Sequence, residues 1–209
     1  MAIVWASNAM INPAMLRPIS HCFDDGSEKG RERYTKGYRG NNAGESLPAE
    51  YFPPEIYVRK DADRNYEKLA ELFFAGSYWV VSREVADVMR QFDLGQGHLY
   101  LTKVFKKDRK TPIGDRWFCL NFGNVKEAYR EGGSDSTYWI PKPQTRHGAP
   151  ITLRDNLLVV GQEALIGPDI WVDPQIRGIF FLSDRLAQAL KAAGVARAFG
   201  LKKCRVEPA

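Results

Sequence analysis

Histidine is the side chain most often used to bind metals and to move protons, and this chain has three of them. His21, His98 and His147 are far apart, and none belongs to a pair with the spacing of metal ligands. The glycines of residues 37–44 lack the Gly-Lys-Ser/Thr of a phosphate-binding loop, and no Gly-x-Gly-x-x-Gly occurs. The sequence therefore predicts neither a metal site nor a cofactor.

Cysteine could supply a nucleophile, and the chain has Cys22, Cys119 and Cys204. Their odd number and wide spacing argue against a disulfide framework or a zinc site. Cys119 and Cys204 lie in strand-like runs, where a thiol usually serves as a small core side chain. This usage fits a protein of the reducing cytoplasm.

Ser82 and Ser183 each end an apolar run and begin a helix-like stretch, the position of the serine in a nucleophile elbow. Neither has the flanking glycines of the Gly-x-Ser-x-Gly motif. We therefore interpret both as helix N-caps, with Gly194 as the C-terminal cap of the helix that Ser183 begins.

Two pairs of carboxylates could act as acid and base, Asp24 with Asp25 and Asp169 with Asp173. The first pair lies in a polar segment, and the second flanks a short aromatic strand. Nothing in the sequence places either pair opposite a base or in a dry pocket. We therefore predict no catalytic residue.

The helices and strands that would position these residues include one strand–helix–strand pattern that occurs twice. Residues 179–206 read as a strand, a helix begun by Ser183 and a second strand, and residues 78–105 repeat this pattern at an offset of 101. The apolar helix positions of the two copies coincide. The pattern predicts an α+β protein with one mixed sheet, built from two similar strand–helix–strand units whose helices lie mainly on one face.

Other elements are predicted from periodicity and turn residues. We expect strands at residues 55–59, 116–122, 157–160 and 170–172, the second forming a hairpin with 100–105, a helix at 66–74, and short helical segments at 124–131 and 162–166.

The chain has 209 residues, with 44% apolar and 26% charged side chains, which is typical of a soluble globular protein. No apolar run approaches the ~20 residues that span a bilayer. Residues 1–9 look like the remnant of an expression tag, so we expect the fold to begin at Met10. We divide the remainder into halves at 10–131 and 151–209, joined by a linker or surface loop at 132–150, within one compact domain.

The formal net charge is +5. The segment Asp24 to Gly44 is polar and rich in glycine, which predicts a long mobile loop. Its Arg31, Arg33, Lys36 and Arg39 could contact phosphate, although a solvated loop is the better interpretation. The basic turn at residues 106–110 likewise predicts an exposed loop tip.

Three phrases resemble a known family. They are YWVVSREVADVMRQFDLG, DRKTPIGDRWFCLNFGNVK and GPDIWVDPQIRGIFFLSDRLAQALKAAGV, and they are similar to immunity proteins of bacterial polymorphic toxin systems, most of all to the eleventh immunity family. The best match runs from Phe180 to Leu186 and includes the Ala193-Gly194 pair. The first copy departs from the motif at residues 83–85. The resemblance supplies no catalytic residues.

This resemblance implies a cytoplasmic protein that neutralises a cognate toxin by direct binding and is not an enzyme. The partner-binding residues and the oligomeric state do not follow from the sequence. Two alternatives stay open. One is a basic accessory protein that binds nucleic acid, which the net charge and the Arg-rich segment support, and the other is a small enzyme with an unrecognised site.

Overall fold

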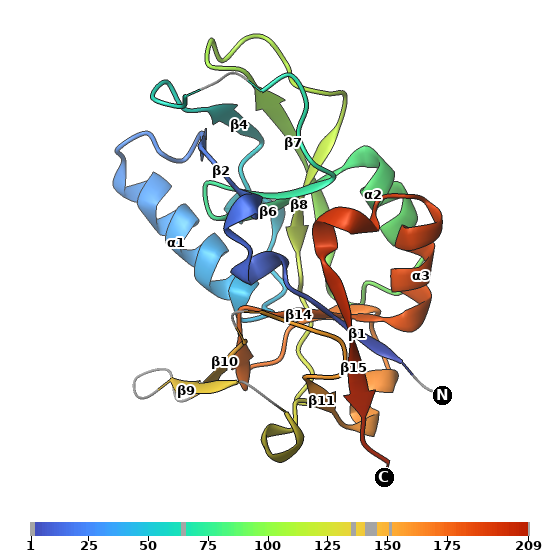
Figure 1. Cartoon of the computed structure of the whole chain (residues 1–209). Helices are drawn as coiled ribbons and strands as arrows, with labels where there is room; N and C mark the ends of the chain where they lie inside the picture. The colour runs from blue at the N-terminus through green and yellow to red at the C-terminus, as the bar shows by residue number, and fades with distance from the viewer. Residues whose placement is uncertain (1–2, 64–65, 135–136, 141–145, 151, 209) are drawn as a thin grey trace.

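The computed structural model describes residues 3–63, 66–134, 137–140, 146–150 and 152–208. These residues form three sheets and three α-helices, a mixed α+β fold as predicted. The helices are α1 (Glu28–Asn42), α2 (Arg83–Met89) and α3 (Asp184–Ala192). In Figure 1, α1 lies across the molecule from α2 and α3, which pack against each other.

The largest sheet has the strand order β2-β5-β6-β8-β7-β4-β3. Its strands are β2 (Leu16–Arg17), β3 (Ile19–His21), β4 (Glu55–Val58), β5 (Leu72–Ala75), β6 (Tyr78–Ser82), β7 (His98–Phe105) and β8 (Trp117–Asn121). The predicted antiparallel hairpin of β7 with β8 is confirmed.

The second sheet has the order β11-β15-β1-β14-β12, and a third sheet has the order β13-β10-β9. Their strands are β1 (Val4–Ser7), β9 (Tyr138–Ile140), β10 (Arg146–Gly148), β11 (Val159–Val160), β12 (Ile170–Trp171), β13 (Ile176–Arg177), β14 (Phe180–Ser183) and β15 (Leu201–Val206). Six short 3-10 helices complete the described elements.

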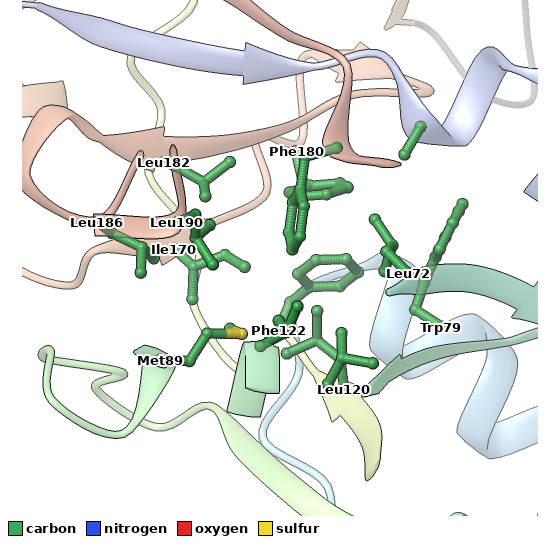
Figure 2. Close-up of a cluster of buried hydrophobic side chains, with 14 of the residues drawn as sticks. Leu72, Trp79, Met89, Leu120, Phe122, Ile170, Phe180, Leu182, Leu186 and Leu190 are labelled. Carbon is green, nitrogen blue, oxygen red and sulfur yellow. The ribbon is translucent and has the colours of Figure 1, made fainter. Parts of the chain in front are cut away.

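Both large sheets are buried on two faces, which is why their central strands are almost uninterruptedly apolar. In β6, Trp79 and Val81 contribute to a cluster between the two sheets, whereas Tyr78 and Val80 face α1. In β14, Phe180 and Leu182 reach the shared cluster from the other side. Figure 2 shows this cluster, in which side chains from both sheets meet those of α2 and α3.

The two strand–helix–strand segments lie in different sheets, contrary to the single sheet predicted. The reason is that each pair of strands flanks a strand from elsewhere in the chain. β6 and β7 both pair antiparallel with β8, and β14 and β15 both pair antiparallel with β1. The helices are also not confined to one face, since α1 covers the face opposite α2. Duplication of the unit stays a prediction.

The prediction that residues 1–9 lie outside the fold is wrong. Val4–Ser7 is the middle strand of the second sheet, bonded to β14 on one side and β15 on the other, and all four of its residues are buried. The segment predicted as a linker or surface loop, 132–150, contains β9 and β10, and a 3-10 helix at Glu131–Gly133 runs into its start.

Two predicted helices are absent from the described residues. Residues 66–71 carry no helix, and Leu72–Ala75 forms strand β5 because its side chains are needed on both faces of the sheet. Residues 124–130 run extended, with bridges from Val125 to Val172 and from Tyr129 to Val160. The predicted helical turn is the 3-10 helix Gln162–Leu165.

The segment predicted to be a mobile loop is helix α1. Ser27 is its N-cap, whose side chain accepts the backbone N–H of Gly30 at 2.9 Å. Its glycines indicate close packing, because Gly30, Gly37 and Gly40 are buried along the inner side of the helix. A Cβ atom at Gly37 would lie 2.4 Å from the carbonyl oxygen of Tyr51.

We predict that Gly37→Ala lowers the free energy of unfolding by about 1–3 kcal/mol, the usual cost of overpacking. Alanine in a helix interior otherwise stabilises by ~1 kcal/mol relative to glycine. Gly40→Ala is the matched control, because there the nearest atoms belong to the movable ends of the Glu45 and Leu47 side chains. Urea denaturation of both variants checks this, and equal stabilisation by both would contradict the close contact.

Candidate functional site

The two serines of the sequence patterns sit at helix N-termini. Ser82 Oγ accepts the N–H of Val85 at 3.3 Å, and Ser183 Oγ accepts the N–H of Leu186 at the same distance. Ser183 also donates its hydroxyl proton to the carboxylate of Asp169, with no imidazole between them. This is capping geometry rather than that of an activated nucleophile.

Gly194 follows the last residues of α3 with a φ of +74°, the left-handed conformation of a helix C-cap. Its N–H bonds the carbonyl of Lys191 at 3.0 Å, and the N–H of Val195 bonds that of Leu190 at 3.0 Å. These bonds satisfy carbonyl groups that the end of the helix leaves free.

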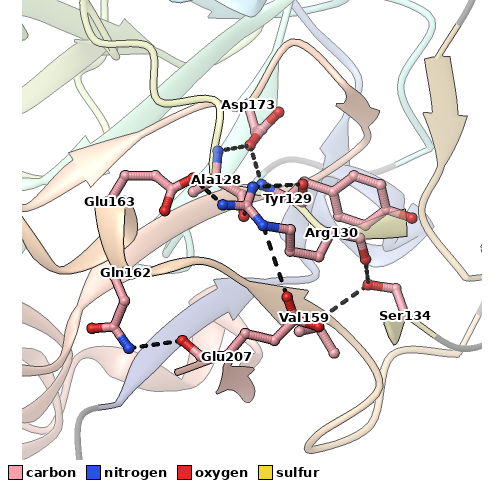
Figure 3. A network of polar contacts seen from close by, with 9 residues as sticks. All are labelled: Ala128, Tyr129, Arg130, Ser134, Val159, Gln162, Glu163, Asp173 and Glu207. Carbon is pink, nitrogen blue, oxygen red and sulfur yellow. Dashed lines mark hydrogen bonds and ion pairs between the residues drawn. The ribbon is translucent and has the colours of Figure 1, made fainter. Parts of the chain in front are cut away.

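The carboxylates flanking β12 are buried and bind backbone groups. Asp169 accepts the N–H of Asp93 at 2.8 Å and the Nε–H of Arg185 at 2.5 Å. Asp173 accepts the N–H groups of Ala128 and Tyr129 at 2.8 and 2.7 Å (Figure 3).

Burial raises the pKa of Asp173, and its backbone hydrogen bonds work against that rise. Both carboxylates of this pair are thus anchors for neighbouring segments. Asp24 and Asp25 lie in the turn before α1, where Asp25 accepts the N–H of Ser27 at 2.8 Å and its hydrogen bonds with Ser27 lower its pKa.

The histidines stay apart in space as well as in sequence. His21 is buried beneath α1, His98 begins β7 at the surface, and His147 lies in β10 against the ring of Trp139. Among the described residues, no group of three or more His, Cys, Asp or Glu side chains could hold a metal ion.

The three thiols are unpaired in the structure. Burial raises the pKa of Cys119 and of Cys204 to about 12, so both stay protonated at neutral pH. Burial also raises the pKa of the half-buried Cys22. A thiol that keeps its proton is a poor nucleophile.

The outward side of α1 carries most of the helix charge. Glu28, Arg31, Glu32, Thr35, Lys36 and Arg39 line a shallow groove of about 630 Å³ there. Lys36 pairs with Glu45 at 2.5 Å, whereas no ion pair of Arg31 or Arg39 is found in the part of the chain that the structure describes. We call Arg31, Lys36 and Arg39 the basic stripe. Arg33 turns aside, over the ring of Phe23.

Helix α1 also borders the two other main cavities. One, of about 620 Å³, lies at its C-terminal end and is lined by Tyr38 and Arg39 together with Asp173 and Ile176. The other, of about 740 Å³, lies near its N-terminal end beside His21. A single rigid helix therefore joins three concave surfaces.

The side chains of the basic turn at residues 106–110 contact other parts of the chain, unlike those of a solvated loop tip. Lys106 pairs with Glu67 at 2.6 Å, and Lys107 donates to the carbonyl of Ala62 at 2.5 Å. The guanidinium of Arg109 lies 3.7 Å from the centre of the Tyr57 ring.

A second exposed feature suits protein contact. Tyr138 and Trp139 are 55% and 56% exposed and lie in β9, the edge strand of the smallest sheet. Large aromatic side chains that stay exposed often serve as interface anchors.

Sequence reasoning named Arg31, Lys36 and Arg39 as possible phosphate contacts but placed them in a mobile loop instead of on a helix. It missed the buried amides of Asn41, Asn121 and Asn124. A signal for α1 was present, because Ser27 precedes Glu28 in the manner of an N-cap and the first turn of a helix. The amides had no such signal, since they bind backbone groups far away in the chain. Asn41, for example, bonds the carbonyl of Leu120 at 2.9 Å.

This arrangement defines an α+β protein with structural caps and anchors and a charged, concave surface around one helix. Comparison with family models matches residues 28–205 to the immunity protein family (Imm11). The match covers most of the chain and runs from the start of α1 into β15, so the chain belongs to this family. No curated protein matches it.

None of the described helices is long and apolar enough to cross a membrane. The longest, α1, has fifteen residues and a highly charged outer side.

We predict that Ser183→Ala lowers the free energy of unfolding by about 1.5–3 kcal/mol, because it removes both a cap and a hydrogen bond to a buried carboxylate. Ser82→Ala, which removes a cap alone, should cost about 0.5–2 kcal/mol. Chemical denaturation measures both. Equal costs would show that the bond to Asp169 adds nothing.

Proposed function

We propose that this protein neutralises one cognate toxin by binding it directly, in a stoichiometric complex, and performs no chemistry itself. Membership of the immunity protein family supports toxin immunity as the role. The buried thiols, the capping serines and the anchoring aspartates all have structural explanations. We place the complex in the cytoplasm of the producing cell, where unpaired cysteines stay reduced.

The observation that carries the proposal is the basic stripe on α1. Arg31 and Arg39 are exposed, lie two turns apart on one side of the helix, and have no ion-pair partner in the described part of the chain. Arginine is enriched among the residues that dominate binding energy at protein interfaces. The helix itself is held by close backbone packing, so its side chains are presented on a rigid support.

The positive charge of the basic stripe indicates that the toxin surface it contacts is acidic. The chain carries a formal net charge of +5, and Arg31 and Arg39 have no ion-pair partner among the described residues, although Glu28 and Glu32 line the same groove. An acidic face on the toxin would complement this surface and accelerate association.

We predict that the pair Arg31→Glu and Arg39→Glu slows association with the toxin ~10-fold or more at low ionic strength. The difference should shrink as salt is added, since exposed charges are screened. Surface plasmon resonance with the purified cognate toxin gives both rate constants.

The control pair is Lys103→Glu and Arg197→Glu, which changes the net charge equally on residues away from the stripe. If both pairs slow association equally, the effect comes from the overall charge of the protein and not from the stripe. If binding is lost only when Tyr138 and Trp139 are substituted, the toxin contacts β9, and the proposal that it binds the basic stripe is wrong. Salt-dependent retention of RNA or DNA that the stripe variants abolish, without toxin binding, would replace the proposal with nucleic-acid binding.

A further inference from the structure

The cavity beside His21 has features that the stripe does not explain. It measures about 740 Å³ and opens between β3, the N-terminal half of α1, the β5–β6 turn and the basic turn at residues 106–110. Four cationic side chains line it: Arg31, Arg59, Lys60 and Arg109. We call it the His21 cavity.

Its positive charge is only partly compensated. Two carboxylates line the cavity, and Asp61 is already paired with Arg59 at 2.5 Å. Asp24 accepts the hydroxyl of Ser20 at 2.8 Å. No ion pair of Arg31, Lys60 or Arg109 is found among the described residues. Like charges collected around one hollow repel each other unless an anion enters it.

One of the residues that line the cavity has a buried polar atom without a partner among the described residues. His21 is only 6% exposed, and its Nδ1 has no hydrogen-bond partner within the described ranges. The ring is stacked on Tyr34 at 5.2 Å and lies against the backbone of Gly76, where a Cβ atom would come within 2.6 Å of it. A buried polar group without a partner costs free energy, which a ligand atom would recover.

Two residues at the rim adopt a backbone conformation that side chains other than glycine disfavour. Ser77 and Arg109 have φ values of +73° and +56°. Ser77 occupies the two-residue turn between β5 and β6, where its hydroxyl is 3.0 Å from that of Tyr34. Such strain is concentrated at functional sites, because the side chain is kept in spite of its conformational cost. The guanidinium of Arg109 lies over the Tyr57 ring.

From the cavity, its uncompensated cations and the unpartnered His21, we propose that the His21 cavity binds an oxyanion, the phosphate or carboxylate group of a ligand. Arg31, Lys60 and Arg109 supply the opposing charge, and the ring of His21, which lines the same cavity, supplies a polar group. The inference does not require the toxin contact, since it concerns the free protein. Its ligand has one of two sources, a free phosphate compound or an acidic side chain of a bound protein.

Titration of the full chain with sodium pyrophosphate at fixed ionic strength, followed by calorimetry and by NMR of the histidine rings, tests this. Saturable binding should shift the ring signals of His21 and leave those of His98 and His147 in place. Arg109→Gly should weaken binding ~10-fold or more, as expected for the loss of one charge-assisted contact. Glycine suits a positive φ, so this variant should keep the fold.

Two control variants separate the cavity from general effects. Lys110→Gln removes a neighbouring charge outside the cavity, and Asn156→Gly relieves the third positive φ far from it. Both should change the affinity less than ~2-fold. Absence of saturable binding, equal weakening by Lys110→Gln, or shifts at all three histidines would overturn the proposal.

Competition identifies the source of the oxyanion. If saturating pyrophosphate weakens toxin binding, and Arg109→Gly does the same, the group is an acidic side chain of the toxin. If toxin binding is unaffected while pyrophosphate still binds, the ligand is a free phosphate compound and the site is separate from immunity.

Discussion

The fold depends on a small set of buried polar side chains that bind backbone groups of distant segments. Asn41 joins the end of α1 to β8, and Asn124 bonds Gln96, Leu94 and Ile170. Asp169 and Asp173 act similarly at the two ends of β12. Each of these bonds satisfies a main-chain group that would otherwise cost about 1–3 kcal/mol when buried without a partner. Together they hold the connections between the two large sheets in one arrangement, so that the apolar side chains between the sheets meet in a single cluster.

This construction explains why the surface of α1 can act as a binding surface. The helix is fixed at its C-terminal end by Asn41 and along its inner side by glycine contacts, so little conformational entropy is lost when its outer side chains bind a partner. The same rigid helix forms part of the wall of the His21 cavity, through Arg31 and Tyr34. A toxin that covers the basic stripe therefore lies close to the cavity, which makes competition between pyrophosphate and toxin informative in either direction.

The sequence predicted those helices and strands that are determined by residues close together in the chain. The strands before Ser82 and Ser183, the helices after them and the hairpin at residues 98–121 follow from apolar runs, capping residues and turn residues. Helix α1 did not follow, because glycine is penalised in helices unless another backbone approaches, and such an approach is visible only in three dimensions. The apolar residues of 66–74 recur with a helical period, so a helix was predicted where strand β5 lies. Pairing of β5 with β6 outweighs this local preference. The buried amides could not be found, since Asn41 and the groups that it binds are about 80 residues apart.

The central claim is that immunity comes from binding, and titration of toxin activity measures it most directly. The purified cognate toxin is held at a fixed concentration well above the dissociation constant, and this protein is added in increasing molar ratio while the toxin's activity is followed. Our account predicts a linear fall that reaches zero at a fixed stoichiometric ratio, with recovery of both proteins chemically unchanged from the complex. Complete protection far below that ratio, or a modified toxin after the complex is dissociated, would show turnover and contradict the account.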